Sequence, residues 1–298
     1  MAVVSLGDYL KSFYEEEKKS LLANYPGLTL HRLKQDIKLH AFLNGIDSED
    51  LFEFPYLSFH TSPITQFIQK LIEGVPLEYI TGYAYFYRSQ FKVDKNVLIP
   101  RSETEILVEM AIGEIQKNYA KRSARVADIG TGSGIIALTL LMECQSKLEV
   151  VASDISEKAL AIAKENYFNL SYAINPHHSI DFIKSDRLQS IPGNFDLILS
   201  NPPYIKRRRD SEGVHQQVRR FEPHMALFIE DDIYDLWFED FFRSIYKKLN
   251  NEGMCLMEGH ENHLSELSKK ALEIGFVKAE VVVDYTGRNR FLNLRKKA

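Results

Sequence analysis

The chain has 298 residues, of which 45% are hydrophobic and 26% charged, and its formal net charge at pH 7 is -4. This length exceeds one average domain, so it predicts a globular protein with two domains or one elaborated domain. The slightly acidic charge excludes the global positive field that many nucleic-acid-binding proteins carry. No basic leader or run of roughly 18 apolar residues is present, so we expect a cytoplasmic protein.

The first part of the chain has the apolar spacing of helices, in segments near residues 6–22, 30–43 and 63–74. The third segment begins at Thr61-Ser62-Pro63, which combines cap-forming hydroxyl groups with a proline at the first helical position. We therefore predict a small helical domain over residues 1–74, which precedes the rest of the molecule.

A linker and a larger domain follow. Residues 75–105 are crowded with tyrosine and phenylalanine around Gly82, so we expect a β-hairpin linker. Strands and helices alternate within residues 106–298, which favours a mostly parallel sheet with helices on both faces. The fold class is thus α/β, with a Rossmann-like seven-stranded domain. Its strands are expected at residues 125–129, 150–153, 180–184, 195–200, 254–258, 277–283 and 290–294.

A glycine-rich turn, Gly130-Thr131-Gly132-Ser133-Gly134, follows the first of these strands, and Asp128 lies just before it. Glycines let the backbone approach a ligand at the carboxyl end of a strand. Their spacing differs from the Gly-x-Gly-x-x-Gly pattern of dinucleotide sites. An acidic residue before the turn suits a cofactor that has a cationic amino-acid end and no pyrophosphate, as S-adenosyl-L-methionine has.

Two further carboxylates end strands of the same sheet. Asp154 closes the second strand, where its carboxylate can accept hydrogen bonds from both hydroxyls of a ribose. Asp186 follows the third strand, where it either meets an adenine amino group or serves as a turn residue. The pattern leaves both interpretations of Asp186 open.

The tetrapeptide Asn201-Pro202-Pro203-Tyr204 follows the fourth strand. Its prolines fix the backbone and lack amide hydrogens, so nearby carbonyl groups can face a ligand. The Asn201 side-chain oxygen and the Pro202 carbonyl can accept both hydrogens of a substrate NH2 group, and Tyr204 offers a flat face for stacking. We predict methyl transfer to a planar amide or amino nitrogen, with Asn201, Pro202 and Tyr204 catalytic and all four residues binding the substrate.

Residues 74–295 resemble the peptide chain release factor N5-glutamine methyltransferases, a family of class I methyltransferases dependent on S-adenosyl-L-methionine. The segments that carry the resemblance are residues 74–82 with Phe86 and Phe91, residues 97–105, residues 221–227, and Asp284 with residues 287–290. The first part of the chain matches this family in character and length more than in motif.

The resemblance implies that the cofactor is S-adenosyl-L-methionine, with S-adenosyl-L-homocysteine as the product. It implies a protein partner, a class I peptide chain release factor, whose Gly-Gly-Gln glutamine is methylated. By position, residues 130–134, Asp154 and Asn201 should bind the cofactor, and residues 201–204 the glutamine. The helical domain and the linker would help to hold the release factor.

The chain departs from the family pattern at several positions. Arg88 and Ser102 stand where glycine and proline are usual, and residues 229–232 lack the usual glycines. Arg187 occupies a position that is often aromatic and lies beside the adenine. Glu258 is retained, but Gly259-His260 replaces an apolar residue followed by glycine.

Other functions remain open on the sequence alone. A related enzyme methylates a glutamine of a ribosomal protein and also has Pro-Arg-Ser in the linker, but Glu103-Thr104-Glu105 fits the release-factor enzymes better. The basic run 206–209 could bind phosphates of a nucleic acid whose adenine or cytosine is methylated. A binding module without activity would not need the intact motifs.

Several absences are also expected. Cys144 and Cys255 have no metal-ligand spacing around them, so we interpret them as buried small hydrophobic residues and expect no metal site. We expect a monomer that does not bind a membrane and does not act directly on nucleic acid.

Overall fold

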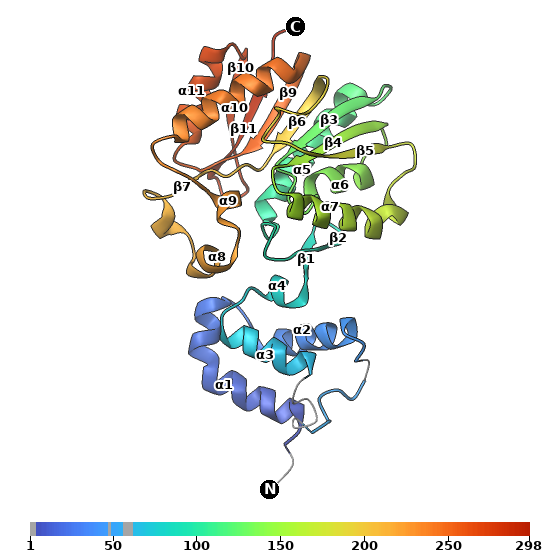
Figure 1. The fold of residues 1–298 in the computed structure, drawn as a ribbon, viewed down its shortest axis with the longest axis vertical. Helices are drawn as coiled ribbons and strands as arrows, with labels where there is room; N and C mark the ends of the chain where they lie inside the picture. Colours follow the sequence, from blue (N-terminus) through green and yellow to red (C-terminus); the bar gives the residue numbers. More distant parts are fainter. Residues whose placement is uncertain (1–3, 47–48, 56–61) are drawn as a thin grey trace. The chain divides into compact units, whose positions relative to one another are not determined.

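The computed structural model describes residues 4–46, 49–55 and 62–298 (Figure 1). The described chain forms two compact units, one of residues 1–83 with 215–221 and the other of residues 84–214 with 222–298. No helix in the described ranges has the length and apolar character needed to cross a bilayer.

The first unit is helical, as predicted. Its helices are α1 (Leu6–Asn24), α2 (Leu30–Leu43), α3 (Pro63–Ile72), α4 (Leu77–Thr81) and α8 (Gln216–Phe221). Helices α1, α2 and α3 begin at Ser5, Thr29 and Ser62, whose hydroxyl oxygens each accept a hydrogen bond from the backbone amide three residues later. The predicted start at Ser62-Pro63 is confirmed, whereas Thr61 lies outside the described residues.

Helix α8 joins this unit although it lies far along the chain. Gln217 Nε2 donates a 2.9 Å hydrogen bond to the Gly74 carbonyl, and Arg220 donates a 3.1 Å bond to the Glu73 carbonyl. Both acceptors follow α3, where helix ends leave carbonyl groups without partners in their own helix. Two side chains of α8 therefore satisfy the end of α3.

The region predicted to be a hairpin linker is partly helical. The hairpin is present as β1 (Tyr83–Phe86) and β2 (Ser89–Lys92). The preceding residues form the short helix α4 rather than a strand. Pro76 occupies the N-cap position, and Gly82, with φ of +82°, ends the helix in the left-handed conformation that glycine adopts readily.

The second unit is built on a seven-stranded sheet of strand order β10-β11-β9-β6-β3-β4-β5. The strands are β3 (Ala124–Ile129), β4 (Leu148–Asp154), β5 (Ser179–Lys184), β6 (Phe195–Ser200), β9 (Leu249–Glu258), β10 (Lys278–Val283) and β11 (Asn289–Arg295). All neighbouring pairs are parallel except the two that include β11. The predicted mostly parallel sheet is confirmed.

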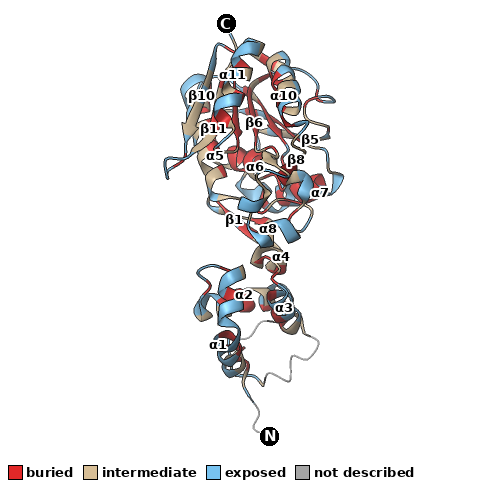
Figure 2. Cartoon of the chain, turned by 90° about the vertical axis from the view of Figure 1, so that its left-hand side faces the viewer, coloured by how far each residue is buried: buried red, intermediate tan, exposed pale blue. Residues whose placement is uncertain are grey.

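Helices cover both faces of the sheet (Figure 1). They are α5 (Ser102–Tyr119), α6 (Ile135–Glu143), α7 (Glu157–Leu170), α10 (Tyr234–Lys248) and α11 (Leu264–Ile274). Val126 of β3 packs with α5 and α6, whereas the next residue, Ala127, packs with α10 and α11, because successive side chains of a strand point to opposite faces. Buried residues concentrate in the central strands, and exposed residues on the outer helix faces (Figure 2).

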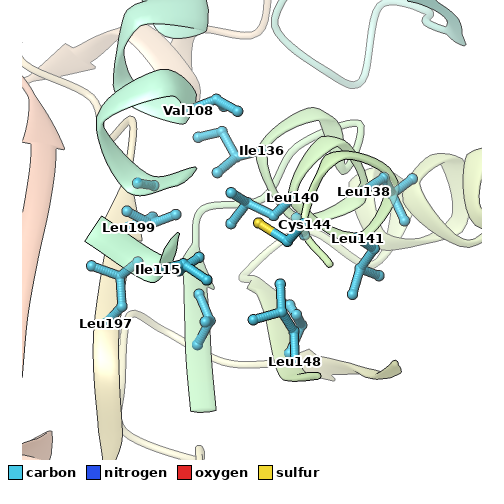
Figure 3. Packing of buried hydrophobic residues seen from close by; sticks show 14 of the residues in the cluster. Val108, Ile115, Ile136, Leu138, Leu140, Leu141, Cys144, Leu148, Leu197 and Leu199 are labelled. Atoms are coloured by element: carbon cyan, nitrogen blue, oxygen red, sulfur yellow. The ribbon is translucent and has the colours of Figure 1, made fainter. Parts of the chain in front are cut away.

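One of the two hydrophobic layers contains Cys144, which packs near Leu140 and Leu148 (Figure 3). Cys255 lies in the opposite layer. Both thiols are free and buried, and burial raises the pKa of Cys144 to about 12. The interpretation of both cysteines as small core residues is confirmed.

Short elements lie between the main strands and helices of the second unit. They are the strands β7 (Ile205–Lys206) and β8 (Phe228–Ile229), the helix α9 (His224–Leu227) and the 3-10 turns Ser171–Ala173 and Ser211–Gly213. Strands β7 and β8 pair in parallel, so the chain after residue 204 is held beside residues 228–229.

Candidate active site

The sheet register brings the predicted site segments together. Ile129 of β3 pairs with Ser200 of β6 on one side and with Ser153 of β4 on the other. The residues that follow these three positions are the 130–134 turn, Asn201 and Asp154. The chain continues from β3 to β4 and from β6 to β9, which lie in opposite directions along the strand order. Open α/β sheets bind ligands at such a switch point.

A cavity of about 510 Å³ opens at this edge of the second unit. The predicted site residues that line it are Gly130, Thr131, Gly132, Ser133, Asp154, Asp186, Arg187, Asn201, Pro202 and Pro203. Asp128, Gly134 and Tyr204 are not among the lining residues. Each of these three instead supports a residue or a helix at the cavity wall.

The 130–134 turn has room for a ligand against its backbone. Gly130 and Gly132 have φ of +74° and +56°, and a Cβ built on either residue meets no atom within 4 Å. Because both residues line the cavity, such a Cβ would take up space inside it. Gly134 differs, since its Cβ would approach Ala163 of α7 to 3.3 Å. Gly134 thus allows α6 to pack closely on α7.

Asp128 shapes this turn from beneath. Its side chain is fully buried, and one carboxylate oxygen accepts bonds from the Thr131 hydroxyl at 2.6 Å and the Ala137 amide at 3.2 Å. The other oxygen has no partner in the described part of the chain. Burial raises the pKa of Asp128 to about 7, although both hydrogen bonds favour the charged form.

Asp154 joins the turn to the cavity wall. Its two carboxylate oxygens accept hydrogen bonds from the Gly132 amide at 3.0 Å and the Ser156 amide at 2.9 Å. Burial raises the pKa of this carboxyl, although the amide bonds favour its ionised form. A carboxylate oxygen has more than one acceptor site, so Asp154 can still accept bonds from hydroxyl groups of a ligand.

Arg187 and Trp237 form a second part of the wall. Arg187 has φ of +50°, and its guanidinium lies 5.3 Å from the centre of the Trp237 ring. Its Nε also donates to Asp186 at 3.2 Å. An arginine stands where an aromatic residue was expected, and Trp237 of α10 supplies an aromatic surface beside it. Sequence reasoning missed Trp237, because nothing near it in the chain marks a site.

Asn201 is held by a buried chain of hydrogen bonds. The Thr104 hydroxyl donates to Glu258 at 2.7 Å, and Asn201 Nδ2 donates to the Thr104 oxygen at 3.1 Å. Because the Thr104 hydrogen lies on the bond to Glu258, the Thr104 oxygen is the acceptor for Asn201 Nδ2. The NH2 end of the Asn201 side chain is therefore occupied, and Oδ1 is left as an acceptor.

Glu258 also anchors the other end of the 201–204 loop. Its second carboxylate oxygen accepts a 3.1 Å hydrogen bond from the Tyr204 hydroxyl. Burial raises the pKa of Glu258, while Arg290 nearby favours its ionised form. Burial and the Glu258 charge raise the pKa of Tyr204, which keeps this hydroxyl protonated as a donor. One carboxylate thus positions both Asn201 and Tyr204.

Two segments that carry the family resemblance meet beside the cavity. Arg101 donates a 2.6 Å hydrogen bond to Glu222, and the Ile99 amide donates to the same carboxylate at 3.2 Å. Ile99, Arg101 and Pro223, the residue after Glu222, line the cavity. Segments 97–105 and 221–227 therefore act together in one wall.

Two arginines of the basic run 206–209 form ion pairs within the second unit. Arg207 forms an ion pair with Glu230, and Arg209 lies 3.7 Å from Asp231, whose carboxylate also accepts the Arg208 amide. Acidic residues that follow β8 therefore pair with Arg207 and Arg209, although both arginine side chains stay partly in contact with solvent. This arrangement does not favour phosphate binding by the run.

Comparisons with known proteins agree with this architecture. Residues 104–221 match the family model described as the methyltransferase small domain. The catalytic domain of hMettl16, solved in complex with MAT2A 3′UTR hairpin 6, has a TM-score of 0.50 at 18% identity and covers 68% of this chain and 74% of that chain. This likeness shows that the second unit has the class I methyltransferase fold.

Several proteins named release factor glutamine methyltransferase are similar over most of their length. The protein of Flavobacterium psychrophilum is 34% identical over 87% of this chain and 89% of its own. The Lactococcus lactis protein is 38% identical over 74% and 71%, and the Streptococcus pneumoniae protein 39% over 74% and 78%. This chain is therefore a methyltransferase that belongs to the release factor glutamine methyltransferase family.

Proposed function

We propose that the protein transfers a methyl group from S-adenosyl-L-methionine to the side-chain amide nitrogen of the glutamine in the Gly-Gly-Gln motif of class I peptide chain release factors. The observation that carries this proposal is the orientation of Asn201, whose Oδ1 is left as an acceptor beside the cavity. The names of the relatives support the substrate. Because release factors act in translation, we infer a cytoplasmic enzyme.

The cofactor would lie along the 130–134 turn. Gly130 and Gly132 leave space for it, Asp154 would accept hydrogen bonds from its ribose, and Asp186 with Arg187 would lie at its adenine. Asp128 would act through the turn, since it holds Thr131 in place. When bound, the cofactor supplies an electrophilic methyl group on a sulfonium.

The 201–204 loop would activate the substrate amide. An amide nitrogen is a poor nucleophile because its lone pair is delocalised into the carbonyl group. Asn201 Oδ1 and the Pro202 carbonyl would accept both amide hydrogens, which raises electron density on nitrogen and fixes its direction. Holding two reactants in line can contribute about 7–11 kcal/mol. After the transfer, the methylated amide nitrogen still carries both of its hydrogens and is positively charged. It is therefore acidic, and water can take one of its protons.

Tyr204 would support this geometry from outside the cavity. Its hydroxyl is fixed by Glu258, and the Tyr234 hydroxyl donates a 3.2 Å hydrogen bond to the Tyr204 carbonyl. Both contacts hold the backbone and the ring at the end of the loop. We infer that the ring supports the loop from outside the cavity, while Pro203 lines the cavity wall.

We assign recognition of the release factor mainly to the helical unit. Helix α8 belongs to this unit although it begins at Gln216, on the segment that follows the 201–204 loop. A short stretch of chain therefore joins the 201–204 loop, which would position the glutamine, to the helical unit, which would bind the release factor. The paired arginines at 207 and 209 give no comparable support to a nucleic-acid substrate.

The test is transfer of a labelled methyl group to a purified release factor. We expect one methyl group on the Gly-Gly-Gln glutamine, located by fragment mass spectrometry, and no transfer when this glutamine is replaced by asparagine. Parallel reactions would contain a ribosomal protein fraction, DNA or RNA. Methylation of one of these in place of the release factor would overturn the proposed substrate.

A further inference from the structure

Asp210, His260 and His263 meet on the second unit, outside the cavity. Their ligand atoms, one from each side chain, all lie within 4.8 Å of one another. His263 Nε2 lies 2.8 Å from Asp210 Oδ2, and the two imidazole rings are stacked with centres 4.7 Å apart. The three side chains are partly buried, so they remain reachable for a small ion.

The local backbone explains why the two histidines lie side by side. They lie three residues apart in the turn that enters α11, where the His263 amide donates a 2.9 Å hydrogen bond to the His260 carbonyl. The carboxylate comes from a different segment, the turn after β7. Because these segments lie about fifty residues apart in the chain, sequence spacing does not reveal the cluster.

The donor set suits a borderline divalent cation. Two imidazole nitrogens and one carboxylate oxygen are typical protein ligands of zinc, with water completing the tetrahedron.

The carboxylate also has an outer partner that fixes its direction. Asp210 Oδ2 accepts a 2.9 Å hydrogen bond from the Lys206 amide, and such second contacts orient metal ligands. On the opposite side, the edge of the Tyr234 ring contacts His263, with centres 5.2 Å apart. Tyr234 in turn donates to the Tyr204 carbonyl. The cluster therefore lies one side chain away from the 201–204 loop.

We propose that Asp210, His260 and His263 form a zinc site that fastens the chain after the 201–204 loop to the turn following β9. Zinc would lie between His263 Nε2 and Asp210 Oδ2, which are now within hydrogen-bond distance of each other. The site lies outside the cavity and acts by holding the loop rather than by taking part in methyl transfer.

The test uses the full chain without a polyhistidine tag, treated with a chelator and then titrated with Zn²⁺ alone in a calorimeter. We expect one ion per chain and a rise in melting temperature, because an ion bound only to the folded state stabilises it. Titration with Co²⁺ should produce the visible absorption of a tetrahedral N/O site. Absence of a saturable one-to-one site would overturn the proposal.

Two ligand variants and a matched control locate the site. His260→Ala and His263→Ala should each weaken zinc binding by about tenfold or more. His177→Ala removes one member of the other adjacent histidine pair, His177 and His178, and should leave the affinity unchanged. Circular dichroism and cofactor binding would show that each variant is folded. Loss of the ion in His177→Ala, or its retention in both ligand variants, would refute the assignment.

Discussion

The hydroxyl of Thr104 donates a 2.7 Å hydrogen bond to the buried carboxylate of Glu258. This bond decides which way the Asn201 amide points, because it leaves the Thr104 oxygen as an acceptor for Asn201 Nδ2. Neither residue belongs to the tetrapeptide that marks the site. The reactive geometry of the loop thus depends on a threonine of α5 and a glutamate at the end of β9.

Replacing Asn201 with alanine should nearly abolish methyl transfer while the protein still folds. The change removes an acceptor that faces the substrate NH2 group, and loss of one such positioned group costs on the order of 100- to 1000-fold in kcat. The measurement is single-turnover transfer to a release factor. Near-normal activity with a normal circular dichroism spectrum would contradict the proposed role.

Thr104→Val should lower kcat more than it changes the KM for the cofactor. Valine keeps the shape but removes the hydroxyl, so the Asn201 amide loses its fixed direction and Glu258 loses a donor. Leaving a buried polar group without its partner costs about 1–3 kcal/mol. We expect this cost to fall on the transition state, where it lowers kcat by roughly 5- to 150-fold. Thr104→Ser restores the hydroxyl and should recover most of the activity. A serine variant as poor as the valine variant would argue that packing, not orientation, is at stake.

Asp154→Asn should weaken cofactor binding with little effect on folding. The amide oxygen of asparagine can keep one backbone bond, but the negative charge that strengthens bonds from ribose hydroxyls is lost. Hydrogen bonds to charged groups contribute about 1.5–3 kcal/mol, so a 10- to 150-fold rise in Kd is expected by calorimetry. Glu157→Gln changes an exposed carboxylate on the same stretch of chain and should leave the Kd unaltered.

Asp128 should make the cofactor-free protein less stable as pH rises. The pKa of this carboxyl is about 7 in the folded chain and 3.8 as its ordinary value. Between these values the folded state holds a proton that the unfolded state has released, so the free energy of unfolding falls with increasing pH, by at most about 1.4 kcal/mol per pH unit.

The isosteric variant Asp128→Asn isolates this contribution. Denaturant unfolding of both proteins between pH 4 and 8 should show the variant gaining stability relative to the wild type up to about pH 7, with no further change above it. Asp181→Asn, which alters an exposed carboxylate on β5, should run parallel to the wild type. A constant difference between Asp128→Asn and the wild type would show that Asp128 is already ionised.

Much of the fold could be predicted because its elements are locally coded. Strands β3, β5 and β6 begin and end within about one residue of the ranges expected from the sequence. The missed helix α5 had a readable signal in the spacing of Leu107, Val108, Ala111 and Ile115. The expected linker, residues 75–105, includes the first turn of α5, so the sequence did not indicate that Thr104 lies on a helix.

The site was predicted only where it follows a strand directly. The 130–134 turn, Asp154 and Asn201 sit at the carboxyl ends of neighbouring strands, so fold class alone brings them together. Trp237 and Glu222 reach the wall through contacts between distant parts of the chain, and such pairings leave no local pattern. That Tyr204 does not line the cavity also depends on the complete fold.

The placement of α8 has a practical consequence for dissecting this enzyme. The chain passes between its two units three times, after residues 83, 214 and 221. Deleting the first 83 residues would not release a finished catalytic fragment, since α8 would be stranded without the carbonyl groups of Glu73 and Gly74. The residue immediately after α8 is Glu222, whose carboxylate accepts a hydrogen bond from Arg101. Truncations designed as though the helical unit were a detachable prefix would therefore cut into the scaffold of the site itself.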